Sequence, residues 1–108
     1  MLKWYKNLYI GENAKKKAKS IIRKINWGTS QLGVYVISLA TNEADHLEIF
    51  SSNYLLQKEA RKICPMIVGI AKGYDEAICL VQAITEEVYM KTQTTNIRTF
   101  LEEEARKA

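Results

Sequence analysis

The chain has 108 residues and a net charge of +4 at pH 7, from 16 basic and 12 acidic side chains. Its hydrophobic content of 47%, with one Pro and five Gly, is typical of a folded domain and argues against disorder. The length excludes an eight-unit βα barrel and a full dinucleotide-binding fold, and no Gly/Ser- or Pro-rich hinge divides the chain. We therefore expect one domain over residues 1–108.

Cysteine usage and the N-terminal segment point to the cytoplasm. The two cysteines, Cys64 and Cys79, form no CxxC pair, whereas small secreted domains usually depend on several disulfides. In the opening MLKWYKNLYIGENAKKK, the lysine cluster follows the apolar residues, which is the reverse of a secretory signal. No stretch approaches the ~18 apolar residues of a membrane span. We expect a cytoplasmic protein with reduced thiols that does not contact membranes.

The N-terminal part of the chain contains one clear helix. Residues 2–10 fit either a strand or a helix, because their apolar side chains share one face in both arrangements. Residues 13–27 carry apolar side chains at helical spacing, with Asn13 able to cap the start and Gly28 able to end the helix. The apolar stripe consists of Ala14, Ala18, Ile21, Ile22 and Ile25.

Two apolar runs predict the central strands. Residues 33–40 and 66–71 do not alternate between apolar and polar, which indicates burial on both faces, as in a parallel sheet. Between them we predict a short helix over residues 42–50 and a second helix over residues 54–62. A strand–helix–strand unit implies a parallel pair with a right-handed crossover. The expected fold class is therefore α/β, a small single domain with a parallel βαβ core flanked by helices.

The C-terminal part predicts a long helix over residues 75–91, after a tight turn. Residues 93–96 interrupt the pattern, and residues 97–101 fit a strand or a helix. The Glu, Ala, Arg and Lys residues that follow favour the helix. Because two strands make only a thin sheet, we expect the terminal segments to add strands, or a partner subunit to cover the remaining apolar surface.

A first candidate site lies at the carboxyl ends of the two strands, where open α/β sheets bind ligands. A glycine at the start of the long helix would leave backbone N–H groups free, and the neighbouring lysine would add positive charge, which suits a phosphate or carboxylate. The same glycine would also serve a plain strand-to-helix turn, so that alternative stays open. The candidate ligand-binding residues are Thr41, Asn42, Lys72, Gly73, Tyr74 and Asp75.

A second candidate site is the basic helix. Residues 1–32 carry eight basic side chains and one acidic side chain, a net charge of +7, whereas residues 33–108 carry a net charge of −3. A basic surface with nearby aromatic residues can bind a phosphate backbone and stack bases. A solvated face, an acidic protein partner, the acidic run 102–104 and a membrane surface are the alternatives. The candidate nucleic-acid-binding residues are Lys15, Lys16, Lys17, Lys19, Arg23 and Lys24, and the nearby aromatic residues are Trp4, Tyr5, Tyr9 and Trp27.

The residues that could carry catalysis or hold a metal are few and scattered. The single histidine, His46, could act only with Cys64 and an acidic residue, and nothing in their spacing supports this. One His and two separated Cys are too few ligands for a metal site. The carboxylates at 86–87 and 102–104 lie in charged helical stretches, where we expect them to be solvated. We predict no catalytic residues, no metal and no cofactor, and lean against an enzyme.

Three segments carry a resemblance to known proteins: the opening LKWYKNLYIGE, the run VYVISLATN, and IVGIAKGYDEA continuing into LVQAITEEVY. Over nearly its full length the chain resembles an uncharacterised family of small cytoplasmic proteins from anaerobic Gram-positive bacteria. That resemblance implies a stand-alone bacterial domain. The family has no known activity, so the resemblance assigns no catalytic or binding residues.

These observations favour a small cytoplasmic binding or regulatory interaction module that self-associates and lacks catalytic machinery. The first alternative is a nucleic-acid-binding protein that uses helix 13–27. The second is a small anion binder, or an enzyme, at the carboxyl ends of the strands. Dependence of binding on the basic helix and on salt separates the first alternative from the other two functions.

Overall fold

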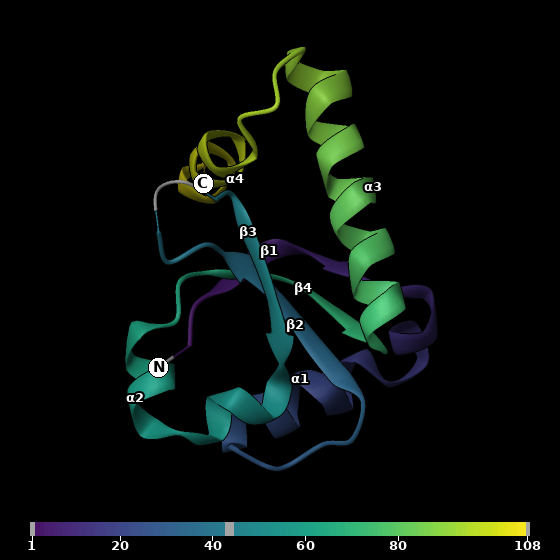
Figure 1. The fold of residues 1–108 in the computed structure, drawn as a ribbon, viewed down its shortest axis with the longest axis vertical. Helices are drawn as coiled ribbons and strands as arrows, with labels where there is room; N and C mark the ends of the chain where they lie inside the picture. The colour runs from purple at the N-terminus through teal and green to yellow at the C-terminus, as the bar shows by residue number, and fades with distance from the viewer. Residues whose placement is uncertain (1, 43–44, 108) are drawn as a thin grey trace.

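The computed structural model of the protein describes residues 2–42 and 45–107. In this part of the chain, one mixed sheet has the strand order β1-β4-β2-β3, and helices cover both of its faces (Figure 1). The strands are β1 (Trp4–Ile10), β2 (Val34–Leu39), β3 (Leu47–Ser51) and β4 (Ile67–Lys72). The helices are the 3-10 helices η1 (Glu12–Lys17) and η2 (Ser52–Leu56) and the α-helices α1 (Ala18–Trp27), α2 (Lys58–Ile63), α3 (Tyr74–Thr92) and α4 (Ile97–Arg106).

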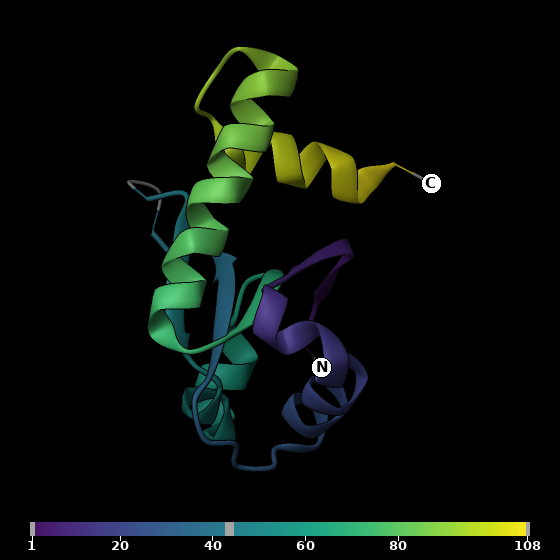
Figure 2. The ribbon, with the colours of Figure 1, turned by 90° about the vertical axis from the view of Figure 1, so that its right-hand side faces the viewer.

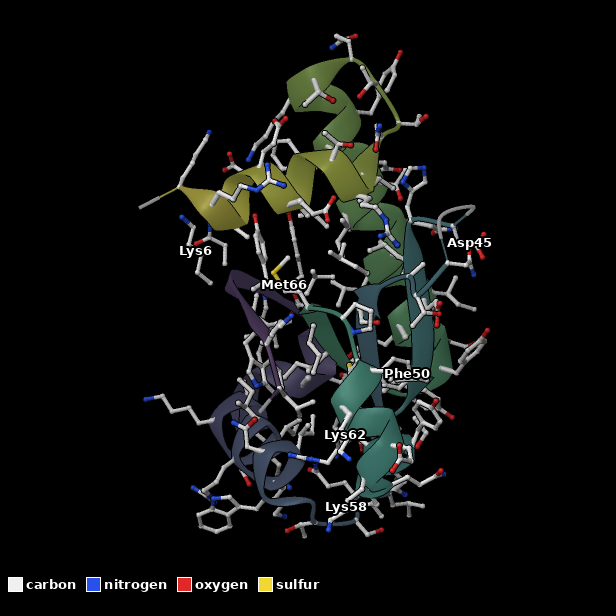
Figure 3. The ribbon with its side chains drawn as sticks, turned by 90° about the vertical axis from the view of Figure 1, so that its left-hand side faces the viewer. Lys6, Asp45, Phe50, Lys58, Lys62 and Met66 are labelled. Carbon is white, nitrogen blue, oxygen red and sulfur yellow. The ribbon has the colours of Figure 1, made fainter. Side chains whose placement is uncertain are left out.

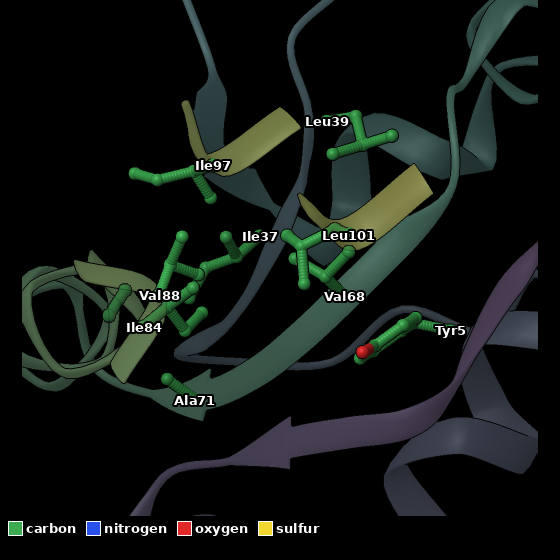
Figure 4. Packing of buried hydrophobic residues seen from close by; sticks show 10 residues of the cluster. Tyr5, Ile37, Leu39, Val68, Ala71, Ile84, Val88, Ile97 and Leu101 are labelled. Atoms are coloured by element: carbon green, nitrogen blue, oxygen red, sulfur yellow. The ribbon is translucent and has the colours of Figure 1, made fainter. Parts of the chain in front are cut away.

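The core consists of two apolar clusters, one on each face of the sheet. On one face, Ile37 of β2 and Val68 of β4 pack against α3 and α4 (Figure 4). On the other face, Val36 and Ile70 pack against η1, α1, η2 and α2. Neighbouring residues of a strand point to opposite faces, so the apolar run of β2 contributes to both clusters. The predicted burial of this strand on both faces is confirmed.

The helices therefore form two outer layers around the sheet. Figure 2 shows α3 on one side of the sheet, η1 and α1 on the other side, and α4 crossing one end. We call η1, α1, η2 and α2 the first layer, and α3 and α4 the second layer. Within the described residues, no helix is both long enough and apolar enough to span a membrane.

The α/β class is confirmed, but the predicted parallel pairing of residues 33–40 with residues 66–71 is wrong. β2 and β4 are antiparallel neighbours, with Val34 opposite Lys72. The parallel pair among the described strands is β1 with β4. Both central strands thus lie where the apolar runs predict them, and only their relative direction differs from the prediction.

The error in direction arises in residues 42–50, which we predicted as a helix. In the described part of this range the chain forms β3, which returns antiparallel to β2 and brings Ile49 opposite Ile37. The chain then passes through η2 and α2 to β4, which runs in the same direction as β3, because both are antiparallel to β2. The helical crossover to β4 therefore starts from β3 and not from β2. In the sheet, β2 lies between β3 and β4.

The N-terminal segment is an irregular edge strand. Of the two alternatives for residues 2–10, the strand is the correct one. Trp4 lies opposite Ile67 and Tyr9 opposite Gly69, so five steps along β1 match only two along β4. The extra residues bulge away from β4 and leave Lys6 and Asn7 exposed. The alternation survives the bulge: Leu2, Trp4, Leu8 and Ile10 pack with the first layer, and Tyr5 and Tyr9 with the second.

Helix 13–27 is present, but in two pieces. η1 winds as a 3-10 helix before α1 begins, and Gly28, with φ 73°, ends α1 in the left-handed conformation as predicted. The predicted capping by Asn13 is wrong, because the first turn follows Gly11, and the Asn13 backbone N–H donates to Glu76.

Of the three other predicted helices, one is corrected and two are confirmed. The predicted helix 54–62 is likewise two pieces, the end of η2 and α2. The long helix 75–91 is confirmed as α3, and the favoured helix for the tail is confirmed as α4. The Asn96 side chain caps α4 by accepting a hydrogen bond from the Thr99 backbone N–H at 3.2 Å.

Candidate nucleic-acid interface

The six residues predicted at a common strand edge are not brought together. Because β2 and β4 are antiparallel, their carboxyl ends lie at opposite ends of the sheet, and Lys72 pairs with the first residue of β2, Val34. One end carries Thr41 and Asn42, and the other carries Lys72, Gly73, Tyr74 and Asp75.

In the turn at residues 72–75, the backbone N–H groups of Lys72 and Gly73 already have acceptors within the protein. The Gly73 N–H donates to the Gly33 carbonyl at 2.7 Å, and the Lys72 N–H donates to the Glu76 carboxylate at 2.9 Å. Gly73 has φ 91°, which a glycine adopts without strain. Tyr74 packs edge-on against Tyr35. This geometry matches the plain strand-to-helix turn that the sequence left open.

The carboxylate of Glu76 holds the start of the basic segment in place. Besides Lys72, it accepts a hydrogen bond from the Asn13 backbone N–H at 2.9 Å, and thus joins α3 to η1. It lies so close to Gly11 that a Cβ there would be 2.1 Å from Glu76 Oε1. A side chain at this position would displace the carboxylate from its two backbone hydrogen bonds, so glycine suits this close approach at the start of η1.

All six predicted basic side chains lie on the outer surface of the first layer. α1 packs Ile21 and Ile25 onto the sheet, and its charged side chains are exposed on the outer side. η1 has about three residues per turn, which spreads its three consecutive lysines around the helix. A hollow of about 620 Å³ runs along η1 and α1, with Ile10 and Ile22 in its lining. Its basic lining residues are Lys15, Lys16, Lys17, Lys19 and Arg23, and the exposed Lys24 lies beside it on α1.

The structure adds a second basic helix that the sequence analysis did not connect with the first. Arg61 of α2 donates to the carbonyls of Ile25 and Asn26 at the end of α1, at 2.9 and 2.8 Å. These charged hydrogen bonds join α2 to α1. Lys58 and Lys62 are exposed on α2 and add two further positive charges to this side of the molecule (Figure 3).

The two outer layers have opposite charge. The first layer contains nine Lys or Arg residues and two Glu residues, a net charge of +7. The second contains seven Asp or Glu residues and three Lys or Arg residues, a net charge of −4. Within the described residues, the one ion pair of the first layer joins Lys15 to Glu12, and both side chains are exposed. We define the basic surface as the nine cations of the first layer: Lys15, Lys16, Lys17, Lys19, Arg23, Lys24, Lys58, Arg61 and Lys62.

Of the four aromatic residues expected near the basic helix, one is presented on this surface. Trp27, at the end of α1, is 75% exposed, with the Arg23 guanidinium 5.8 Å from its ring centre. Trp4 is partly buried and donates its indole N–H to Asn26. Tyr5 and Tyr9 stack on each other and face the second layer instead. Trp27 is thus the aromatic side chain of the four that is free to stack with a base.

The residues considered for catalysis have structural partners. The His46 Nδ1 atom accepts a hydrogen bond from the Arg98 backbone N–H. The Cys64 thiol contacts the Pro65 carbonyl, and burial raises its pKa, which makes the thiolate scarcer at neutral pH. Within residues 2–42 and 45–107, no group of three His, Cys, Asp or Glu side chains is arranged to hold a metal ion.

Comparison with known proteins found no family model, no curated protein and no solved structure that matches the chain. The resemblance drawn from three sequence segments therefore stays a prediction. The clearest feature of the molecule that bears on function is the charge difference between the two layers.

Proposed function

We propose that the protein binds single-stranded nucleic acid on its basic surface. The observation that carries this proposal is the collection of nine cations in one layer, beside the exposed ring of Trp27. Cations bind phosphates and release counterions, and an exposed aromatic ring stacks with a base of any sequence. The acidic second layer repels a polyanion and so orients it toward the first layer.

The test is the salt dependence of binding by short fluorescein-labelled RNA and DNA, measured by anisotropy. We expect the logarithm of the affinity to fall linearly with the logarithm of the salt concentration, by about 0.7 for each phosphate contacted. The triple variant Lys16→Gln/Lys19→Gln/Arg23→Gln should lose roughly tenfold to a hundredfold in affinity near physiological salt and show a shallower slope.

The matched control removes three cations elsewhere, in Lys6→Gln/Lys91→Gln/Lys107→Gln, and should retain near-normal affinity. An equal loss in both variants would mean that net charge, not the basic surface, attracts the nucleic acid. Absence of binding at low salt would leave the basic surface as a solvated face. Equal affinity for a duplex would remove the stacking role of Trp27 from the proposal.

Self-association, the leading expectation from the sequence, is a second candidate function, favoured by β3. This strand lies at an edge of the sheet and has neither Lys nor Pro, the residues that commonly protect an edge. Uncovered apolar sheet faces do not favour self-association, because the four strands lie between two helical layers. Light scattering after gel filtration decides between monomer and dimer.

We also propose a cytoplasmic location, because Cys64 and Cys79 are both free and would stay reduced there. Labelling of the two thiols in lysates prepared with and without reductant tests this. Quantitative labelling without reductant supports a reducing compartment.

A further inference from the structure

A second pocket lies where β2 ends, at the end of the sheet crossed by α4. It has a volume of about 540 Å³, within the range of roughly 300–1,000 Å³ typical of small-molecule sites. Figure 3 looks onto this side of the molecule and shows Met66, one of its lining residues, between α4 and α2. It shares no lining residue with the basic surface. Ligand binding in this pocket would therefore be independent of nucleic-acid binding.

The lining is apolar on one side and cationic on the other. The end of β2 and the connection from α2 to β4 supply apolar atoms, and Ile63 at the end of α2 is 63% exposed. Arg98 and Arg106 of α4 and Lys3, which precedes β1, supply three positive charges, against one negative charge from Glu102. None of these four side chains forms an ion pair with a described residue. The apolar lining residues are Leu39, Ala40, Ile63, Pro65, Met66 and Ala105.

Arg98 is held in place and still has an unused donor. Its Nη2 donates to the carbonyls of Ala40 and Asn42, which fixes the guanidinium against the end of β2. Its Nε is shielded from solvent with no described acceptor, and its Nη1 donates to no described residue, so Nη1 is the donor left for a ligand in the pocket. Buried polar groups in proteins almost always have a partner, and a guanidinium suits the paired oxygens of a carboxylate or phosphate.

We propose that this pocket binds a small molecule with one acidic group on an apolar body. The acidic group, a carboxylate or a phosphate, lies against Arg98, with Lys3 and Arg106 adding charge. The apolar body covers Met66 and Ile63. Glu102 disfavours ligands with several negative charges, since it places a carboxylate in the same pocket.

The test uses three probes that share one apolar chain: octanoate, octyl phosphate and neutral octanol. Calorimetry with the full chain should detect binding of at least one anion, with octanol at least about tenfold weaker, as expected for the loss of a charged hydrogen bond. The two anions distinguish carboxylate from phosphate recognition. Amide resonances of Thr41 and Ala105 should shift on titration with the anion that binds.

Two kinds of variant locate the site without disturbing the core. Lys3→Gln/Arg106→Gln should weaken anion binding at least about tenfold, because both side chains are exposed and contribute mainly charge. Ala105→Trp, at another exposed position, should fill the pocket and abolish binding of the anion. A matched Lys58→Gln/Lys62→Gln variant on the basic surface should retain it.

The proposal is overturned if neither anion binds, if octanol binds as tightly as the anions, or if Ala105→Trp leaves the affinity unchanged. Retained anion affinity in Lys3→Gln/Arg106→Gln together with loss in Lys58→Gln/Lys62→Gln would assign the anion to the basic surface and would also overturn it.

Discussion

The two helical layers pack on the sheet by the same means, through apolar stripes, but they present opposite charge to solvent. α1 contributes Ile21 and Ile25 to one apolar cluster, and α3 contributes Ile84 and Val88 to the other. Outside these stripes the first layer has a net charge of +7 and the second a net charge of −4. The fold needs the apolar stripes, whereas the outer charges are free to serve binding.

The layers also differ in how continuous their helices are. α3 is one helix of 19 residues, while the first layer is built from four pieces of at most 10 residues. Short helices depend on tertiary contacts, here the Glu76 carboxylate at the start of η1 and the Arg61 guanidinium at the end of α1. The basic surface is therefore positioned by a few specific polar contacts as well as by burial.

The largest loss of stability is expected from substitutions in the core, and it should be equal on the two faces of the sheet. Ile37 faces the second layer and Ile70 faces the first, and both are fully buried. Ile37→Ala and Ile70→Ala should each lower the free energy of unfolding by about 2–5 kcal/mol, measured by urea denaturation. A much smaller loss for Ile70→Ala would mean that the first layer is not part of the cooperative unit.

The next largest loss of stability is expected when the polar link between the layers, the Glu76 carboxylate, is removed. Glu76→Ala removes the acceptor of two backbone N–H groups and should lower the free energy of unfolding by about 2–3 kcal/mol. Glu86→Ala, at an exposed position of the same helix, should stay within about 0.5 kcal/mol and serves as the control.

Gly11 provides a sharper version of the same experiment. Gly11→Ala should destabilise the protein, because its Cβ would meet the Glu76 carboxylate, while its φ of −63° is ordinary for alanine. In the Glu76→Ala background the same substitution should cost little, so the two changes are not additive. Additive losses would show that Gly11 is needed for a reason other than this contact.

Trp27 should separate binding from stability. Because its ring is 75% exposed, Trp27→Ala should change the free energy of unfolding by no more than about 0.5 kcal/mol. Loss of one stacked base should weaken single-strand binding by about 1–3 kcal/mol, which anisotropy detects. Tyr89→Ala, an exposed aromatic position in the second layer, should leave binding unchanged. Equal affinity of Trp27→Ala and the unmodified protein would exclude stacking.

Sequence patterns located the buried elements well because their signals are local. The apolar run of β2 and the stripe of α3 follow from side-chain spacing alone. The helix predicted over 42–50 failed because Asn42 and Asp45 resemble a helix start. In the structure the Asn42 side chain accepts from the Asp45 backbone N–H at 2.9 Å, a hydrogen bond that closes a turn as readily as it caps a helix. That single error reversed β4 relative to β2.

Only the part of the basic surface on η1 and α1 could be predicted from the sequence, and the part on α2 could not. The cations of η1 and α1 are adjacent in the sequence, so their charge is visible there. Lys58 and Lys62 join them only because Leu55 and Ala60 pack in the same cluster as Ile25. Contacts across about 35 residues of chain leave no mark in local spacing. The pocket at the end of β2 combines four separate segments, and of its lining residues only Thr41 was predicted to bind a ligand.

The smallest expected effect lies in the pH dependence of the second layer. The Tyr9 hydroxyl donates to the Glu87 carboxylate, and burial together with this carboxylate raises its pKa above the usual value of 10.0. The folded protein thus holds this proton more tightly than the unfolded chain. The contribution to stability is complete below pH 10 and is lost as the pH rises toward the folded-state pKa.

Tyr9→Phe removes this titration together with the hydrogen bond to Glu87, so it should lower the melting temperature slightly at pH 7 and make it fall less steeply above pH 10. Glu87→Gln should have an intermediate effect, because it removes the negative charge but leaves the ring partly buried. Lys17→Gln in the first layer should leave the alkaline branch unchanged. If Tyr9→Phe and the unmodified protein show the same alkaline decline, the loss of stability comes from other groups, and the contact between β1 and α3 is not the pH-sensitive link of the second layer.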